Sequence, residues 1–444
     1  MAISAWEKYL AVRSFDPKAH FNLGVCANAV GKGAAALASF EKAFELQPSM
    51  ADAGANAAGL LIQAGEAERA CALCYLALKG DPDSSAALYN LNTALRMAGR
   101  PNEAIAFSWR WIRERLPPGT PSYAIATSLE TLSTAPGNNS RESWNDDGPL
   151  PFSLSVAKQA ELPIFRGSTG AFGSDAAKST GCVGDCSACD ATVCEDGSGG
   201  EGFVTVVCVR WGSKYGPEYV ERLAAGVRRN LRRSHRFICY TDDVQALGGM
   251  AGVVGRPLGT RGCGEWKGWW HKAFLFSREA ELAGRILYID LDTVIAGSLD
   301  DVAGYSGPFA VLSAEGMANE RRPAGLNSSV MSWDAGEEAA TVQPVYGLLQ
   351  EAYSVVTACV HKLDHWLEMT VPGAESLHSV VSDQIVEYAS LRLASAEAAG
   401  KDAVERDSLL VELPRNARIV CFPLEPKPHQ VTEYWVSRMW RGGR

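Results

Sequence analysis

Two aspartates separated by one residue, Asp290 and Asp292, are the strongest chemical signal in the sequence. They follow the apolar run Ile286-Leu287-Tyr288-Ile289, which has the length and composition of a buried β-strand. Residues i and i+2 of an extended strand point to the same side, so both carboxylates can reach one hard divalent cation. Mg²⁺ or Mn²⁺ suits such oxygen ligands, and a bound cation can bridge a nucleotide diphosphate. The pair therefore predicts a metal site that handles a phosphate-containing substrate.

Two enzyme classes place an aspartate pair at the end of a buried strand. Asp290-x-Asp292-x-Val294 satisfies the Asp-x-Asp-x-(Thr/Val) signature of haloacid-dehalogenase-like phosphatases, in which the first aspartate is the nucleophile. That motif normally ends the first strand of its domain, whereas Asp290 stands well inside the domain that begins near residue 203. No later Asp-Asp pair in a strand-end context completes a phosphatase acidic cluster. These features favour a metal-assisted transferase and leave the phosphatase as the alternative.

The segments around the aspartates alternate between predicted strands and helices. Residues 203–209 form a continuous apolar run typical of a strand buried on both faces, and residues 217–232 carry apolar side chains at helical spacing. Further strands are expected at 236–240 and near 253–254, and a helix at 266–276. This alternation predicts a mixed, mostly parallel α/β sheet, whose ligands bind beyond the carboxyl ends of the strands.

Blocks of sequence in a fixed order resemble the glycogenin-like family-8 glycosyltransferases and their bacterial relatives over nearly all of residues 203–440. The blocks are Trp269-Trp270-x-Lys272, Tyr288 to Val294 followed by Gly297 to Asp301, Leu326 to Trp333, Ser382-Asp383-Gln384, and Pro426-Lys427-Pro428. The resemblance implies a Rossmann-like GT-A fold. It also implies a UDP-sugar donor, a protein or carbohydrate acceptor, and transfer with retention of anomeric configuration.

The resemblance also implies roles for individual residues. Asp290 and Asp292 match the metal ligands, with Asp292 expected in direct contact. Asp383 and Gln384 match the pair beside the anomeric carbon, and Lys272 matches a lysine that reaches the donor's sugar and phosphates. The remaining expected donor contacts are Asn327, Ser328 and Ser329 for the sugar, Lys427 for the diphosphate, and Asp242 or Asp243 for the uracil or ribose.

The carboxy-terminal block departs from the family pattern. The family has a histidine and a glycine before the Lys-Pro pair, and that histidine is a third metal ligand; here Pro423 and Leu424 precede Glu425, and no histidine precedes Lys427. Cys421 is a soft ligand that suits Mg²⁺ poorly, and His429 lies on the far side of Lys427. The alternative function is therefore a binding protein whose transferase fold has lost turnover.

His361-x3-His365 is interpreted as an exposed helix face rather than a zinc site, within an insert at 335–377 expected to shape the acceptor side.

The amino-terminal part repeats with a period of 34 residues. Gly31, Gly65 and Gly99 keep this spacing, as do Ala36, Ala70 and Ala104, and prolines near 48, 82 and 117 close each unit. The pattern resembles the tetratricopeptide repeat, as does the stretch Ala43 to Pro48. We predict three repeats in an all-α domain at 1–117, with an added helix at 5–14, and the resemblance implies that they bind a protein partner.

A segment rich in Ser, Gly, Pro, Asn and Asp, at 118–202, is predicted to be a flexible linker before the catalytic domain at 203–444. It contains four closely spaced thiols, which could bind zinc or an iron–sulfur cluster or simply belong to an insert without metal. They are Cys182, Cys186, Cys189 and Cys194.

Charge and hydropathy exclude other classes. The net charge of −9 argues against a general nucleic-acid or anionic-membrane binder. The sequence contains neither a signal-peptide pattern nor an apolar run of the roughly 18 residues needed to span a bilayer. The other eight cysteines are scattered among apolar neighbours, as buried free thiols are. We therefore expect a cytoplasmic protein.

Overall fold

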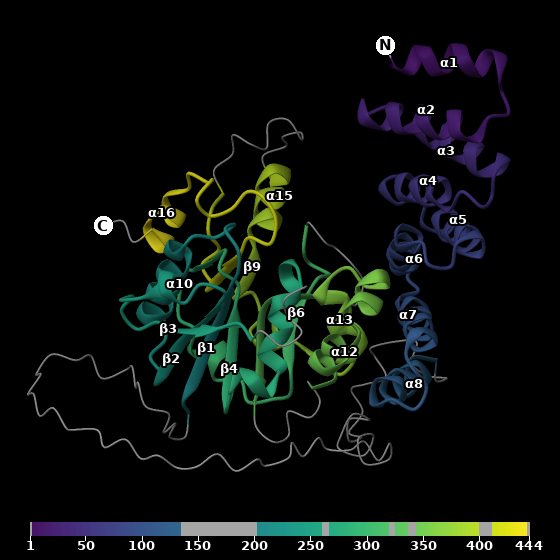
Figure 1. Cartoon of the computed structure of the whole chain (residues 1–444). Helices are drawn as coiled ribbons and strands as arrows, with labels where there is room; N and C mark the ends of the chain where they lie inside the picture. Colours follow the sequence, from purple (N-terminus) through teal and green to yellow (C-terminus); the bar gives the residue numbers. More distant parts are fainter. Residues whose placement is uncertain are drawn as a thin grey trace, which may run out of the picture.

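The computed structural model describes residues 2–134, 202–259, 266–318, 325–335, 343–398 and 411–441. In these ranges an all-helical amino-terminal part lies against an α/β carboxy-terminal part (Figure 1). The four clustered cysteines at 182–194 lie outside the described residues.

The amino-terminal part is a series of antiparallel helix pairs. Its helices are α1 (Ala2–Val12), α2 (Pro17–Ala29), α3 (Gly33–Leu46), α4 (Ala51–Gln63), α5 (Ala67–Gly80), α6 (Ser85–Met97), α7 (Pro101–Arg115) and α8 (Pro121–Thr134). The pairs α2/α3, α4/α5 and α6/α7 are the three predicted repeats, and α1 is the added helix. Asp16 caps α2, accepting hydrogen bonds from the backbone N–H groups of Lys18 and Ala19 at 3.0 and 3.2 Å.

The 34-residue period has a structural basis at each of its positions. Gly31, Gly65 and Gly99 have φ of +73°, +79° and +73°, and no heavy atom lies within 4 Å of where a Cβ would be. These glycines are therefore required for backbone conformation rather than for space. The alanines at 36, 70 and 104 are fully buried between helices.

The boundary of the helical part differs from the prediction. Helix α8 falls at 121–134, inside the range expected to be linker. It packs on α7 and buries Ala126 and Leu129 in the core shared with the α/β part. Its sequence is rich in Ser and Thr, which do not favour helix interiors, so the sequence did not predict a helix here. In the structure these hydroxyl groups hydrogen-bond to carbonyls one turn earlier, as Thr127 does to Tyr123.

The α/β part is built on a seven-stranded mixed sheet of order β3-β2-β1-β4-β7-β6-β8. Its strands are β1 (Val204–Arg210), β2 (His235–Thr241), β3 (Val254–Pro257), β4 (Arg285–Ile289), β6 (Ala310–Ser313), β7 (Leu326–Asp334) and β8 (Glu375–Ser376). Strands β3, β2, β1 and β4 run parallel, and β7 is antiparallel to both β4 and β6. This confirms the predicted mixed, mostly parallel α/β sheet.

A second, three-stranded sheet has the order β5-β10-β9. Its strands are β5 (Thr293–Ile295), β9 (Ile385–Glu387) and β10 (Ile419–Cys421). The helical segments of this part are α10 (Pro217–Asn230), η2 (Gln245–Leu247), η3 (Gly268–Phe276), η4 (Arg278–Ala280), α11 (Asp300–Ala303), α12 (Gln343–Cys359), α13 (Leu363–Thr370), α14 (Leu377–Val380), α15 (Tyr388–Ala398) and α16 (Tyr434–Trp440). The helix predicted at 266–276 is thus the 3₁₀ segment η3.

Each face of the large sheet belongs to a different hydrophobic core. In β1, Val207 and Val209 face the core that contains η3, α12 and α13, whereas Val206 and Cys208 face the core that contains α10 and α16. The uninterrupted apolar sequence of β1 follows from this burial on both faces. No helix in the described ranges is long and apolar enough to cross a membrane.

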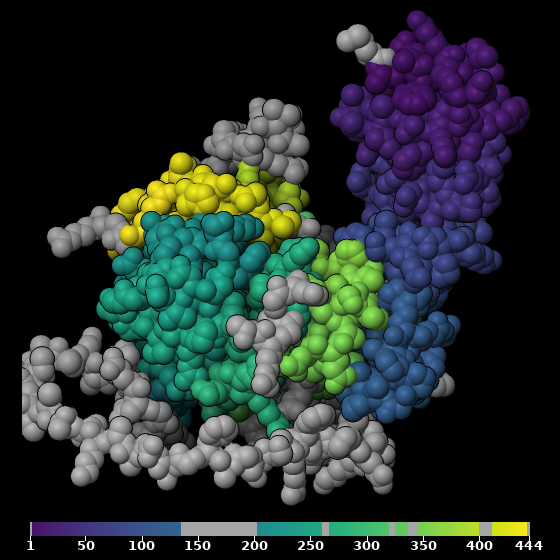
Figure 2. Space-filling view, in the orientation of Figure 1, coloured from purple at the N-terminus to yellow at the C-terminus, as the bar shows by residue number. Residues whose placement is uncertain are grey.

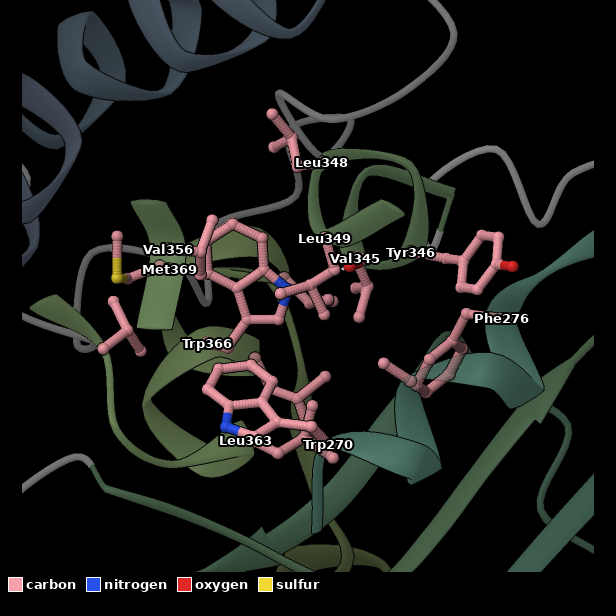
Figure 3. Packing of buried hydrophobic residues seen from close by; sticks show 14 of the residues in the cluster. Trp270, Phe276, Val345, Tyr346, Leu348, Leu349, Val356, Leu363, Trp366 and Met369 are labelled. Atoms are coloured by element: carbon pink, nitrogen blue, oxygen red, sulfur yellow. Dashed lines mark hydrogen bonds between the residues drawn. The ribbon is translucent and has the colours of Figure 1, made fainter. Parts of the chain in front are cut away.

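Helices α6, α7 and α8 share a core with α12 and α13 (Figures 1 and 2). Trp109 of α7 and Trp366 of α13 are both fully buried, with ring centroids 5.4 Å apart. Figure 3 shows Trp366 among Val356, Leu349 and Met369 of α12 and α13, near Trp270 of η3. The repeats and the α/β part are therefore joined by a continuous apolar core.

Candidate active site

The two aspartates follow β4, which lies between β1 and β7 in the sheet. The carboxyl ends of the parallel strands β1, β2 and β4 meet at this edge, and the Asp290 N–H donates to the Ser329 carbonyl of β7 at 2.9 Å. The predicted strand-end position of the pair is confirmed.

Asp290 is held by Lys272 of η3 and by Tyr288. The Lys272 Nζ lies 2.8 Å from Oδ1 and 2.9 Å from Oδ2, and the Tyr288 hydroxyl donates to Oδ1 at 2.5 Å. Burial raises the pKa of Asp290 above its ordinary value, while the Lys272 ammonium opposes this rise. Both oxygens of Asp290 are thus engaged by the protein.

Asp292 is 6% exposed and uses only one of its oxygens. Its Oδ2 accepts hydrogen bonds from the Tyr215 hydroxyl and from the Lys427 Nζ, both at 2.7 Å. In the described part of the chain Oδ1 has no hydrogen-bond donor. Asp292 therefore has the oxygen that a cation can bind without displacing a neighbour.

Lys427 is 3% exposed, and all its ammonium donors are used. Besides Asp292, it donates to the carbonyls of Phe422 at 2.7 Å and Pro423 at 3.0 Å. The segment that departs from the family pattern thus supplies backbone oxygens that hold this lysine beside Asp292.

No third metal-ligating side chain joins the aspartates: the described ranges contain no cluster of three or more His, Cys, Asp or Glu residues suited to a metal. Cys421 pairs with Thr293 near them, but burial raises the pKa of its thiol and the two carboxylates raise it further. It therefore stays protonated and is a poor ligand. His429 instead uses its Nδ1 in a hydrogen bond with the Tyr219 hydroxyl.

The Asn327-Ser328-Ser329 segment is buried beside Lys272. The Lys272 Nζ donates to the Ser328 carbonyl at 3.3 Å and to its Oγ at 3.2 Å, and the Asn327 Oδ1 accepts from the Ser329 N–H at 3.0 Å. The structure therefore brings Lys272, Asp290 and Ser328 together.

Asp242 and Asp243 follow β2 and are both exposed. The Asp242 Oδ2 accepts from the Gly212 N–H at 2.8 Å, which ties it to the loop after β1, where the Trp211 ring lies 5.4 Å from that of His271. Asp243 instead accepts from the Ala246 N–H at 3.1 Å, at the start of η2. Of the two, Asp242 lies with the aromatic rings at the sheet edge.

In the described part of the chain no hydrogen bond or ion pair joins Asp383 or Gln384 to the two aspartates. Both residues precede Ile385. Ile385 pairs with Ile419, which pairs with Ile295, and these three residues form one end of the small sheet. Thr293, next to Asp292, lies at the other end. The Gln384 side chain donates to Asp301 of α11 at 2.8 Å. Asp383 is exposed in a turn with φ of +58°, a conformation that short polar residues tolerate. The place of this pair beside the anomeric carbon stays a prediction.

On the expectation from the resemblance that the chain turns over a UDP-sugar, Asp383→Asn is expected to stay within about twofold of wild type, because this exposed residue has no hydrogen bond or ion pair to the aspartates in the described part of the chain. The measurement is UDP release under saturating donor, with Asp290→Asn as a positive comparison. A loss on the order of a hundredfold in Asp383→Asn, the size typical of a catalytic acid or base, would return this residue to the site.

The interpretation of His361 and His365 as an exposed helix face is wrong. His365 is buried in α13, and His361 precedes that helix with its ring 4.5 Å from that of Tyr89 in α6. Burial lowers the pKa of His361. These histidines belong to the contact between the repeats and the α/β part.

Sequence reasoning did not identify Tyr215 and Tyr288, the two hydroxyl donors to the aspartates. A signal for Tyr288 exists in the sequence, since Tyr288 stands two residues before Asp290 at the end of β4 and so shares its side of the strand. Tyr215 lies in the loop after β1, and only the strand order places that loop beside β4.

No protein-family model matches the chain, and no curated protein sequence matches it. Among solved structures it is similar to MamA, with 15% identity over 34% of this chain and 68% of that one and a TM-score of 0.23. It is also similar to the glycosyltransferase GlyE of Streptococcus pneumoniae TIGR4, with 14% identity over 54% of this chain and a TM-score of 0.36. The bifunctional glycosyltransferase WbbM gives 9% identity over 52% of this chain and a TM-score of 0.33.

The chain spans 61% of the length of GlyE and 48% of that of WbbM. The structural neighbours of the chain thus include glycosyltransferases. At TM-scores and identities this low the function has to be argued from the site.

Proposed function

We propose that residues 203–444 transfer a sugar from a nucleotide-diphosphate donor, a UDP-sugar, to a protein or carbohydrate acceptor, with Mg²⁺ or Mn²⁺ as cofactor. The observation that carries the proposal is the pairing of each aspartate at the carboxyl end of β4 with a buried or half-buried lysine. Retention of anomeric configuration rests on the sequence resemblance alone. A protein partner bound by the repeats is part of the same proposal.

Lysines and carboxylates in this arrangement suit a diphosphate. Lys272 comes from η3 and Lys427 from the segment after β10, so their ammonium groups approach the aspartates from two different elements. Each ammonium can donate hydrogen bonds to phosphate oxygens. Charge-assisted hydrogen bonds of this kind are among the stronger ones. Ser328 and Asn327 lie next to Lys272, where the sugar of the donor would follow its phosphates.

The residues present fit a hard divalent cation. Asp292 Oδ1 is open to it, and Mg²⁺ is commonly held by one or two carboxylates together with substrate phosphates, so a third protein ligand is not required. When bound, the cation would supply Lewis-acid stabilisation of the charge that develops on the leaving diphosphate. Asp292 would hold it directly, while Asp290 keeps Lys272 oriented towards Ser328.

The phosphatase alternative is less well supported by this geometry. A nucleophilic aspartate has to present a carboxylate oxygen to the phosphorus atom. Asp290, the residue that would attack, gives both oxygens to Lys272 and Tyr288. The site is built to hold this carboxylate in place rather than to free it.

Metal and nucleotide are expected to bind together. The two aspartates and two lysines neutralise one another, so Mn²⁺ alone meets carboxylates that already have counter-charges, and UDP alone meets lysines that are already paired. With both bound, Lys427 could turn to phosphate and Asp292 to the cation, while Asp290 would keep its contacts with Lys272 and Tyr288. We expect saturating Mn²⁺ to tighten UDP binding at least about fivefold, within the usual range of coupling between two ligands.

Calorimetric titration of UDP with Mn²⁺ and with EDTA measures this coupling directly. Equal affinities under both conditions would contradict a metal that binds between Asp292 and the diphosphate. A panel of UDP-sugars, screened with Mn²⁺ for protection against thermal unfolding, then identifies the donor, because a ligand bound only by the folded state stabilises it. Failure of every UDP-sugar to raise the unfolding midpoint would count against the proposed donor class.

A further inference from the structure

The start of β7, which carries Ser328, leaves the regular sheet at the candidate donor site. Strand β6 pairs with β7 at Leu312↔Asn327 and next at Val311↔Met331, so Ser328, Ser329 and Val330 fall in a bulge without partners on β6. Bulges of this kind re-aim side chains and occur next to active sites. Their backbone N–H groups still need acceptors, because a buried unpaired donor is costly.

Helix α13 supplies one acceptor to the bulge and a second to the start of β7 just before it. The Asp364 Oδ1 accepts from the Ser328 N–H at 2.9 Å, and the Glu368 Oε1 accepts from the Leu326 N–H at 2.8 Å. Asp364 and Glu368 are one helical turn apart, a rise of about 6 Å. Two residues of a strand span about 6.6 Å. The spacing of the carboxylates on the helix therefore matches that of the N–H groups on the strand.

The repeats hold one of these carboxylates. The Arg96 Nη1 of α6 forms an ion pair with the Glu368 Oε2, and the two side chains are 4% and 6% exposed. Arg96 is itself oriented by Asn92, whose Oδ1 accepts from its Nε at 2.7 Å, and Asn92 donates to the Ser108 Oγ of α7 at 2.8 Å. A connected set of hydrogen bonds thus runs from α7 and α6 to the first residue of β7.

The same strand edge ends at the candidate active site. Ser328 receives two hydrogen bonds from Lys272, and Lys272 pairs with Asp290. Displacement of the Ser328 backbone would therefore move a hydrogen-bond acceptor of Lys272, the lysine that pairs with Asp290.

We propose that Asp364, Glu368 and Arg96 are positioning residues of the donor site, through which the last repeats fix the strand edge that carries Ser328. The repeats are then a structural part of the catalytic domain as well as a binding module. The inference rests on the proposed function for its kinetic consequence, and on the backbone contacts alone for its structural one.

Asp364→Ala and Asp364→Asn, made in the full chain, separate positioning from simple packing. Asparagine keeps an oxygen that accepts from the Ser328 N–H, and alanine does not. We expect Asp364→Ala to speed hydrogen exchange of the Ser328 amide about tenfold and to raise the KM for the UDP-sugar about tenfold with a smaller change in kcat, since this is the usual effect of losing a hydrogen bond to a charged group. Asp364→Asn should stay within about twofold of wild type in both measurements.

Glu351→Ala is the matched control. Glu351 of α12 accepts a hydrogen bond from Ser122 of α8, so this variant also removes a carboxylate contact between the repeats and the α/β part. The contact comes from α12, whereas the acceptors at the start of β7 come from α13. The variant should leave both the exchange of Ser328 and the KM unchanged. If Asp364→Ala behaves like Glu351→Ala, if Asp364→Asn loses as much as Asp364→Ala, or if exchange rises without any change in KM, the positioning role is overturned.

Arg96→Met tests the contribution of the repeats. It removes the Arg96 charge that faces the buried Glu368, and we expect about tenfold faster exchange of the Leu326 amide. Adding Glu368→Gln should restore protection, because the amide oxygen still accepts from Leu326 without a charge to neutralise. Should Arg96→Met not fold, the double variants R96M/E368Q and R96M/E368M decide the point: equal exchange of Leu326 in the two would refute the role of Glu368 as acceptor.

If the wild-type chain turned over no UDP-sugar, the proposed function would fail, and the exchange rates would still decide whether these residues hold the strand edge.

Discussion

Asp292→Asn is expected to abolish donor turnover, lowering kcat/KM for the UDP-sugar by about a thousandfold or more, because a metal-ligand carboxylate contributes several kcal/mol to transition-state stabilisation. Asparagine has nearly the same shape but no charge, so the variant removes the proposed cation ligand and the counter-charge of Lys427 together. The measurement is the rate of UDP release over a range of donor concentrations with saturating Mn²⁺.

Loss of activity in Asp292→Asn has to be separated from loss of folding. Lys427 is 3% exposed, and a buried charge that has lost its partner costs about 3–5 kcal/mol. Assays therefore belong at a temperature below the unfolding midpoints of both proteins. Tyr215→Phe is the matched variant, since it removes the other hydrogen bond to Asp292 Oδ2 and keeps the carboxylate. We expect Tyr215→Phe to lose about tenfold at most; equal losses in the two variants would mean that the carboxylate itself is not the essential group.

Trp109→Ala is expected to destabilise the whole molecule by about 3–5 kcal/mol, the usual cost of truncating a fully buried tryptophan. Its ring is fully buried in α7 and lies 5.4 Å from that of Trp366 in α13, within the core that the repeats share with the α/β part. Because that core is continuous, we expect the truncation to lower the unfolding temperature of the α/β part as well as that of the last repeats.

Calorimetry with and without UDP and Mn²⁺ tests this expectation. Phe40→Ala is the control, since Phe40 is buried in the first repeat within a small cluster that contains no residue of the α/β part. Both variants lower the stability of the repeats, but only Trp109→Ala should lower the midpoint of the ligand-stabilised transition. A Trp109→Ala protein in which the UDP-stabilised transition stays at its wild-type temperature would show that the two parts are independent.

Local sequence patterns were sufficient to predict the elements that are long and periodic. The apolar run at 203–209 predicted β1, and the run before Asp290 predicted β4, because a strand buried on both faces must be apolar throughout. The 34-residue period predicted the helix pairs, since each glycine adopts a backbone conformation that other residues avoid.

Three-residue strands have too little pattern to be predicted in this way. Asp383 and Gln384 matched a sequence block, but their place depends on β9, which spans Ile385–Glu387 and pairs with β10. The direction of so short a strand decides which end of the small sheet its flanking residues occupy. A motif match therefore identified the segment without fixing where its side chains lie.

The contact between the repeats and α13 was not visible in the sequence at all. Arg96 and Glu368 are 272 residues apart, and each looks like a solvated helix charge when only its neighbours in the chain are considered. His361 and His365 were placed on an exposed face for the same reason. Burial of these polar groups follows from the docking of α6 on α13, a long-range event that leaves no local periodicity.

Release of UDP from a UDP-sugar by the purified full-length chain with Mn²⁺ is the most direct test of the central claim. We expect UDP to be released from at least one common UDP-sugar, with turnover lost on chelation by EDTA and in Asp292→Asn. No UDP from any common UDP-sugar, together with unchanged behaviour of Asp292→Asn, would contradict a glycosyltransferase. Phosphate release from simple phosphoesters that is lost in Asp290→Asn would instead establish the phosphatase.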